Sequence, residues 1–157
     1  LTDHYDPTKK VVRLSTNNYR TSSVAAHAVA AHEVGHAIQH ANGYAALNIR
    51  NALLPVANIG SQFGPILAIF GIMLGATGLL QIGVWLFAAA VAFQLITLPI
   101  EFDASRRALN QMQTLGIVTP TDTGGARSVL TAAAMTYVAA AATSIAYLLY
   151  FLSASRD

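Results

Sequence analysis

The stretch HEVGH at residues 32–36 holds the residue types of a catalytic zinc site. His32 and His36 are four residues apart, so on a helix both imidazoles lie on one face. Two such rings can bind one Zn²⁺ ion at about 2.0 to 2.1 Å, and the ion lowers the pKa of a bound water molecule toward about 7. Glu33 lies at the edge of the same face, where it can take a proton from that water. The spacing predicts one catalytic Zn²⁺ ion with Glu33 as general base for peptide hydrolysis.

The third zinc ligand must come from another part of the chain, because an open catalytic zinc site normally has three protein ligands. The chain has no cysteine, which leaves histidine and carboxylates. A third histidine at position 42, with glycine at 39, is excluded because these residues are Asn42 and Gln39. The only glutamate outside HEVGH is Glu101, and an apolar hairpin that crosses a membrane and returns would bring it back to the side of the two histidines. We therefore predict Glu101 as the third ligand, with Asp103 and His40 as the next candidates.

The segment before and around the motif predicts a small β-hairpin followed by a helix. LTDHY and KKVVRLS are short and β-branched or alternating, and DPTK between them is a turn signal. Thr21, Ser22 and Ser23 offer helix N-caps to the Ala-rich stretch that contains HEVGH, and Gly43 is expected to end this helix.

Two long charge-free stretches predict membrane helices. No Asp, Glu, Lys or Arg occurs between Arg50 and Glu101, or between Arg127 and Arg156. One span needs about 20 apolar residues, so the first stretch can hold two spans and the second stretch one. We predict helices over 59–80, 83–100 and 129–152, with the first turn near Gly78, Gln81 and Gly83. The fold class is therefore a mainly α membrane protein with an N-terminal β-hairpin, a zinc helix and about three transmembrane helices; a soluble helical bundle is the alternative.

The length of 157 residues suits a single membrane-embedded domain. Its expected parts are the hairpin and zinc helix at 1–50, a transmembrane hairpin at 59–100, a third-ligand segment at 101–128 and a transmembrane helix at 129–152. The sequence begins without a Met and without a signal peptide, so a segment upstream is expected.

The basic residues predict the orientation in the membrane. Three spans place all Lys and Arg residues on one side except Arg156, and the positive-inside rule makes that side cytoplasmic. We expect a multi-pass protein of the bacterial cytoplasmic membrane whose active site faces the cytoplasm. The lipid bilayer is thus one partner, and nucleic acid is not expected because the basic residues form no dense cluster.

The substrate is expected to be a peptide or membrane protein held against an edge strand formed by Val11, Val12, Arg13 and Leu14. Main-chain pairing carries little sequence information, so the cleavage specificity is not predicted. Arg106 and Arg107 have two interpretations: they stabilise the developing oxyanion, or they anchor the chain at the membrane surface.

A noncatalytic metal-binding membrane scaffold or transporter component is the alternative function. A closed structural zinc site favours four protein ligands and does not need Glu33. Three candidate ligands with a carboxylate placed as a base favour the enzyme.

Three stretches of the sequence, HEVGHAIQHA, NALLPVANIGSQFGP and LPIEFDASRRAL, together resemble the YugP-type neutral zinc metallopeptidases of bacterial membranes. The chain is more distantly similar to the HtpX class of membrane gluzincins. The resemblance implies His32, His36 and Glu101 as zinc ligands, Glu33 as general base, and a further membrane helix upstream. Gluzincins commonly have an Asp four residues after the ligand glutamate to orient a ligand histidine. This chain has Ser105 there, which becomes the candidate for that role.

Overall fold

A two-stranded hairpin opens the fold in the computed structural model, which describes residues 2–155. Strands β1 (His4–Asp6) and β2 (Val11–Arg13) are antiparallel, with Tyr5 opposite Val12. The Asp6 carboxylate accepts hydrogen bonds from the backbone N–H groups of Thr8 and Lys9 and so closes the turn. The predicted hairpin is confirmed.

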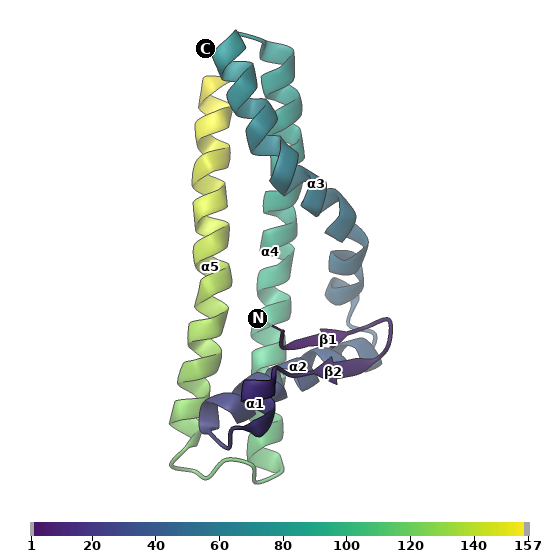
Figure 1. Cartoon of the computed structure of the whole chain (residues 1–157), viewed down its shortest axis with the longest axis vertical. Coiled ribbons are helices and arrows are strands. Elements are labelled where there is room, and N and C mark those ends of the chain that lie inside the picture. The colour runs from purple at the N-terminus through teal and green to yellow at the C-terminus, as the bar shows by residue number, and fades with distance from the viewer. Residues whose placement is uncertain (1, 156–157) are drawn as a thin grey trace. The chain divides into compact units, whose positions relative to one another are not determined.

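Two helices follow the hairpin (Figure 1). The short helix α1 (Thr16–Arg20) precedes α2 (Val24–Ala41), which contains HEVGH. The Ser23 hydroxyl caps α2 by accepting from the N–H of Ala26 at 3.1 Å, and Gly43 follows its end with a φ of +62°. Of the predicted cap candidates Ser23 is confirmed, Thr21 instead ends α1, and the predicted end of the helix before Gly43 is confirmed.

The remaining helices are α3 (Ala45–Leu74), α4 (Thr77–Thr114) and α5 (Thr123–Ala154). All three are long and apolar enough to cross a membrane. The predicted fold class, mainly helical with an N-terminal hairpin and three such helices, is confirmed.

The turn between α3 and α4 lies at Gly75 and Ala76, so its predicted position near Gly78, Gln81 and Gly83 was wrong. Gly83 lies inside α4, where a Cβ would overlap the backbone nitrogen of Ala68 and come within 2.7 Å of the Gly64 carbonyl oxygen. This glycine allows close packing of helices α3 and α4. The predicted third-ligand segment, residues 101–128, is mostly helical, because α4 continues to Thr114 and α5 begins at Thr123.

The chain divides into two compact units, of which the first carries the site. It comprises the chain up to Asn48 and Pro99–Thr136. Its apolar core joins α2, the end of α4 and the start of α5, through Ala28, Ala108, Met112, Val118, Ala126 and Leu130.

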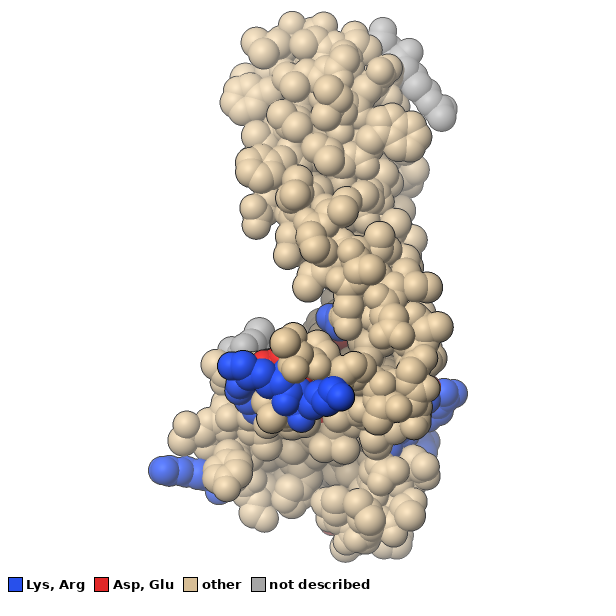
Figure 2. All heavy atoms as spheres, turned by 90° about the vertical axis from the view of Figure 1, so that its right-hand side faces the viewer, with Lys and Arg blue, Asp and Glu red and all other residues tan. Residues whose placement is uncertain are grey.

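The second unit comprises Ile49–Leu98 and the chain from Tyr137 onward, and among its described residues Arg50 is the only Asp, Glu, Lys or Arg. Large apolar side chains such as Phe63, Trp85 and Leu149 are exposed on it. Figure 2 shows Lys and Arg side chains gathered over one part of the visible surface and a large part with no charged side chain. Such a surface suits contact with lipid. Arg156, the basic residue expected on the opposite side of the membrane, lies outside the described residues.

Candidate metal centre

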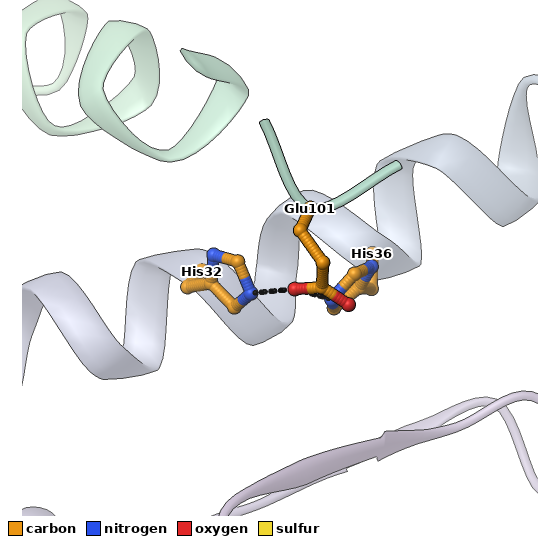
Figure 3. Close-up of side chains that lie close together, drawn as sticks. All are labelled: His32, His36 and Glu101. Carbon is orange, nitrogen blue, oxygen red and sulfur yellow. Dashed lines mark hydrogen bonds and ion pairs between the residues drawn. The ribbon is translucent and has the colours of Figure 1, made fainter. Parts of the chain in front are cut away.

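Two histidines of α2 and one glutamate of α4 converge in the first unit (Figure 3). Oε2 of Glu101 lies 3.0 Å from Nε2 of His32 and 3.6 Å from Nε2 of His36. One ligand atom from each residue lies within 4.8 Å of the other two. The structure thus brings together the three predicted ligands.

Gly35, inside the motif, allows α2 to approach α4 closely. A Cβ at this position would overlap the backbone carbonyl oxygen of Ala104. A glycine in a helix interior destabilises the helix by about 0.5–1 kcal/mol relative to alanine, so its presence here calls for a packing reason. Close contact at Gly35 brings the turn of α4 that carries Glu101 against the turn of α2 that carries the histidines.

The Glu101 carboxylate is buried, with 2% of the residue exposed. A buried carboxylate needs a cationic partner or a metal ion, because leaving water is unfavourable for an isolated charge. Burial by itself would lower the pKa of His36, but the hydrogen bond and charge of Glu101, assisted by Gln39 and Glu33, raise this pKa above its ordinary value. The group therefore attracts positive charge, which a proton or a metal ion can supply.

The donor set fits zinc in chemistry and in size. Two imidazole nitrogens and one carboxylate oxygen form a common set for a catalytic zinc ion, and ligand atoms of a tetrahedral zinc lie about 3.4 Å apart. The two distances from Glu101 to the histidines, 3.0 and 3.6 Å, lie on either side of that value, and the three ligand atoms all lie within 4.8 Å of one another, so they would draw closer together around an ion. His32, His36 and Glu101 are therefore the residues that would hold the ion.

Each histidine also has a partner on its other ring nitrogen. The Ser105 hydroxyl lies 3.2 Å from Nδ1 of His32, which is the contact expected of a residue that orients a ligand. Gln39 Oε1 lies 3.0 Å from Nδ1 of His36. The sequence pattern did not point to Gln39; the available signal was an amide three residues after a ligand histidine on the same helix.

Glu33 is partly buried on α2 and is not a member of the three-residue group among the described residues. Its negative charge is the smallest of the influences that raise the pKa of His36. The role of Glu33 as general base stays a prediction.

The two arginines near the site pair with Asp103. Arg107 Nε donates to an Asp103 carboxylate oxygen at 2.6 Å, and Arg106 donates to the other oxygen. The Arg106 side chain is 79% exposed, and the Arg107 guanidinium lies 6.0 Å from the centre of the Tyr44 ring. The next ligand candidates have other partners: Asp103 binds the arginines, and His40 Nδ1 lies 2.7 Å from the Tyr5 hydroxyl.

The candidate substrate strand belongs to the hairpin, which packs against α2. Val11, Val12 and Arg13 form β2 and Leu14 follows it. Arg13 forms an ion pair with Asp6 at 3.0 Å. The sheet has two strands within the described residues, so each strand has one edge without a strand partner.

Comparison with known families agrees with this site. A family model described as "Putative neutral zinc metallopeptidase" matches residues 1–156. The chain belongs to this family. It is also 50% identical over 152 residues to the "Putative membrane protease YugP" of Bacillus subtilis strain 168, and the match covers 97% of this chain and 68% of that protein. No solved structure matches. Membership of the zinc metallopeptidase family accords with the His-His-Glu group, and the relative's description accords with the three apolar helices.

Proposed function

We propose that the protein is a membrane-bound endopeptidase that depends on one zinc ion held by His32, His36 and Glu101. The observation that carries the proposal is the meeting of these three side chains at a buried glutamate that has two imidazole partners. A zinc ion bound there would polarise a peptide carbonyl and lower the pKa of a water molecule.

Glu33 is the general base in this proposal. Its carboxylate takes the proton of the attacking water and passes it to the amine that leaves when the peptide C–N bond breaks. Glu101 supplies the negative charge that balances the cation, and Ser105 keeps the His32 ring in position through Nδ1. Asp103 already binds the guanidinium groups of Arg106 and Arg107, so neither is free to stabilise an oxyanion. We therefore assign both arginines to anchoring at the membrane surface.

The substrate is a peptide or a segment of a membrane protein that pairs with the free edge of β2. A groove between the hairpin and α2 gives space for a bound chain near this strand; it is lined by Tyr5 of β1, Lys10 of the turn before β2, and Ala37, His40 and Ala41 of α2. The biased distribution of basic residues supports a cytoplasmic active site, with the protein in the bacterial cytoplasmic membrane.

Substitution of Glu33 by Gln tests the proposal. The variant keeps the size of the side chain but cannot accept a proton as a base, so casein or peptide cleavage is expected to fall by at least about 100-fold while zinc is retained. Turnover equal to the wild type would refute the mechanism. Loss of zinc from Glu33→Gln would instead make Glu33 a ligand.

A further inference from the structure

Gln39 is a fully buried amide that joins a metal-ligand candidate to a pair of arginines. Its residue has 0% exposure. Oε1 lies 3.0 Å from Nδ1 of His36, while Nε2 lies 2.8 Å from the carbonyl oxygen of Ile100 and 2.9 Å from Oδ2 of Asp103. Asp103 is bound in turn by Arg106 and Arg107.

The chemistry of these partners determines the orientation of the amide. A backbone carbonyl and an ionised carboxylate only accept hydrogen bonds, so the NH₂ group of Gln39 must face Ile100 and Asp103. Both of its N–H bonds are then used. The Gln39 oxygen, which only accepts, is left facing His36, and Nδ1 of His36 must therefore carry a proton.

A proton on Nδ1 leaves Nε2 of a neutral His36 ring with the free lone pair. Nε2 is the nitrogen that lies 3.6 Å from Oε2 of Glu101. His32 has no equivalent constraint, because its Nδ1 partner is the Ser105 hydroxyl, which can donate or accept.

We propose that Gln39 is a positioning residue that holds His36 in its Nδ1-protonated form and so presents Nε2 to the metal ion. Asp103 and the Ile100 carbonyl prevent the Gln39 amide from turning over. The arginines stabilise the charge of Asp103, so the chain of contacts extends from the exposed Arg106 to the metal site. The assignment rests on the proposed function, since it assumes that His36 binds zinc.

Zinc affinity is the first measurement, by competition with a chromophoric chelator at a fixed pH in detergent. Gln39→Met keeps the side-chain volume but removes all three hydrogen bonds, and we expect it to lower zinc affinity about 10- to 100-fold, as losses of groups that orient a ligand do. Thr97→Val is the control. Thr97 is also a buried polar residue of the chain, but its hydroxyl donates to Phe93 in its own helix, so zinc affinity should not change.

Exchanging the amide of Gln39 and the carboxylate of Asp103 tests the hydrogen bond between them independently of Gln39→Met. Gln39→Glu places two carboxylates against each other and should weaken zinc binding. Adding Asp103→Asn restores a donor opposite the new carboxylate, which still accepts from His36, so the double variant should bind zinc more tightly than Gln39→Glu alone. A double variant no better than Gln39→Glu would overturn the proposal, as would wild-type affinity in a folded Gln39→Met protein.

Nitrogen NMR of His36 distinguishes this proposal from the proposed function. In metal-free wild-type protein, at a pH high enough to make the ring neutral, Nδ1 should carry the proton; in Gln39→Met this preference should be lost. A neutral His36 protonated on Nε2 in the wild type would overturn the positioning role. If Nδ1 is protonated but the wild type binds no zinc, the positioning inference holds and the zinc function fails.

Discussion

Oε2 of Glu101 lies 3.0 Å from Nε2 of His32, although 69 residues separate them along the chain. Glu101 follows Pro99 in α4 and His32 lies in α2, and both residues belong to the same compact unit. A buried carboxylate placed against two imidazoles, in a chain of the neutral zinc metallopeptidase family, is the basis of the proposed metal centre.

Replacing Glu101 with Gln should remove most of the zinc affinity. The amide keeps the size of the side chain but lacks the charge that balances Zn²⁺, so we expect a loss greater than the roughly 10- to 100-fold expected for Ser105→Ala, which removes only a partner of His32. Zinc titration of both variants in detergent measures the difference. Wild-type affinity in Glu101→Gln would move the third ligand to another residue.

Replacing Gly35 with Ala should disturb the metal centre through the backbone. The new Cβ would overlap the Ala104 carbonyl oxygen, and overpacking of this kind typically destabilises by about 1–3 kcal/mol, more than the gain of about 0.5–1 kcal/mol from better helix propensity. We expect a lower melting temperature and weaker zinc binding. Gly124→Ala is the matched control, because a Cβ there meets no atom within 4 Å. If both variants behave alike, the close contact does not position Glu101.

The hairpin should loosen from α1 at acid pH because of Asp3. The carboxylate accepts from the Ser15 N–H at 2.8 Å and from Asn18 Nδ2 at 2.9 Å. Burial raises the pKa of Asp3, but these hydrogen bonds outweigh it and lower the pKa below its ordinary value of 3.8. Because the pKa is lower in the folded state, the ionised Asp3 carboxylate stabilises the contact fully above pH 3.8. This stabilisation is lost as the pH falls through the lowered pKa.

Amide hydrogen exchange of the hairpin over this pH range checks the Asp3 prediction. In Asp3→Asn the group no longer titrates, so this part of the pH dependence should disappear. An unchanged pH profile in the variant would assign the effect to another group.

Labelling of single cysteines should report three membrane crossings. The chain contains no cysteine, so introduced residues at Asn17, Gly78, Thr121 and Ser155 can be labelled one at a time in vesicles. We expect Asn17 and Thr121 on the cytoplasmic side and Gly78 and Ser155 on the other. Gly78 suits the turn region because a Cβ there meets open space. Labelling of Gly78→Cys from the same side as Asn17→Cys would show that α3 and α4 do not cross.

Local patterns were enough to predict most elements of the fold. The Ser23 cap, Gly43 and the charge-free stretches each act through neighbouring residues, so the hairpin, the zinc helix and three apolar helices could be recognised. The α3–α4 turn could not be placed from pattern alone, because a glycine in an apolar helix serves close packing as well as turns. Gly83 packs against Ala68, while Gly75 makes the turn.

The candidate site residues that lie at a characteristic spacing, or that are rare in the chain, could be predicted from the sequence. His32 and His36 follow from their spacing and Glu101 from being the only other glutamate, and these three side chains meet; the role of Glu33 stays a prediction. Gln39 could not be predicted from spacing, because its role depends on a hydrogen bond to Asp103, 64 positions further along the chain. The two side chains meet only when α2 and α4 pack together.

Zinc reconstitution of the metal-free protein is the sharpest test of whether His32, His36 and Glu101 form a catalytic zinc site. Zinc is removed with a chelator, added back in steps, and peptide cleavage is measured at each step in the wild type and in Glu33→Gln. We expect no cleavage without metal, activity that rises to a plateau at one zinc per chain, and in Glu33→Gln the same zinc uptake with cleavage lower by at least about 100-fold. Cleavage that persists in the zinc-free protein, or that Glu33→Gln performs as well as the wild type, would rule out the zinc mechanism.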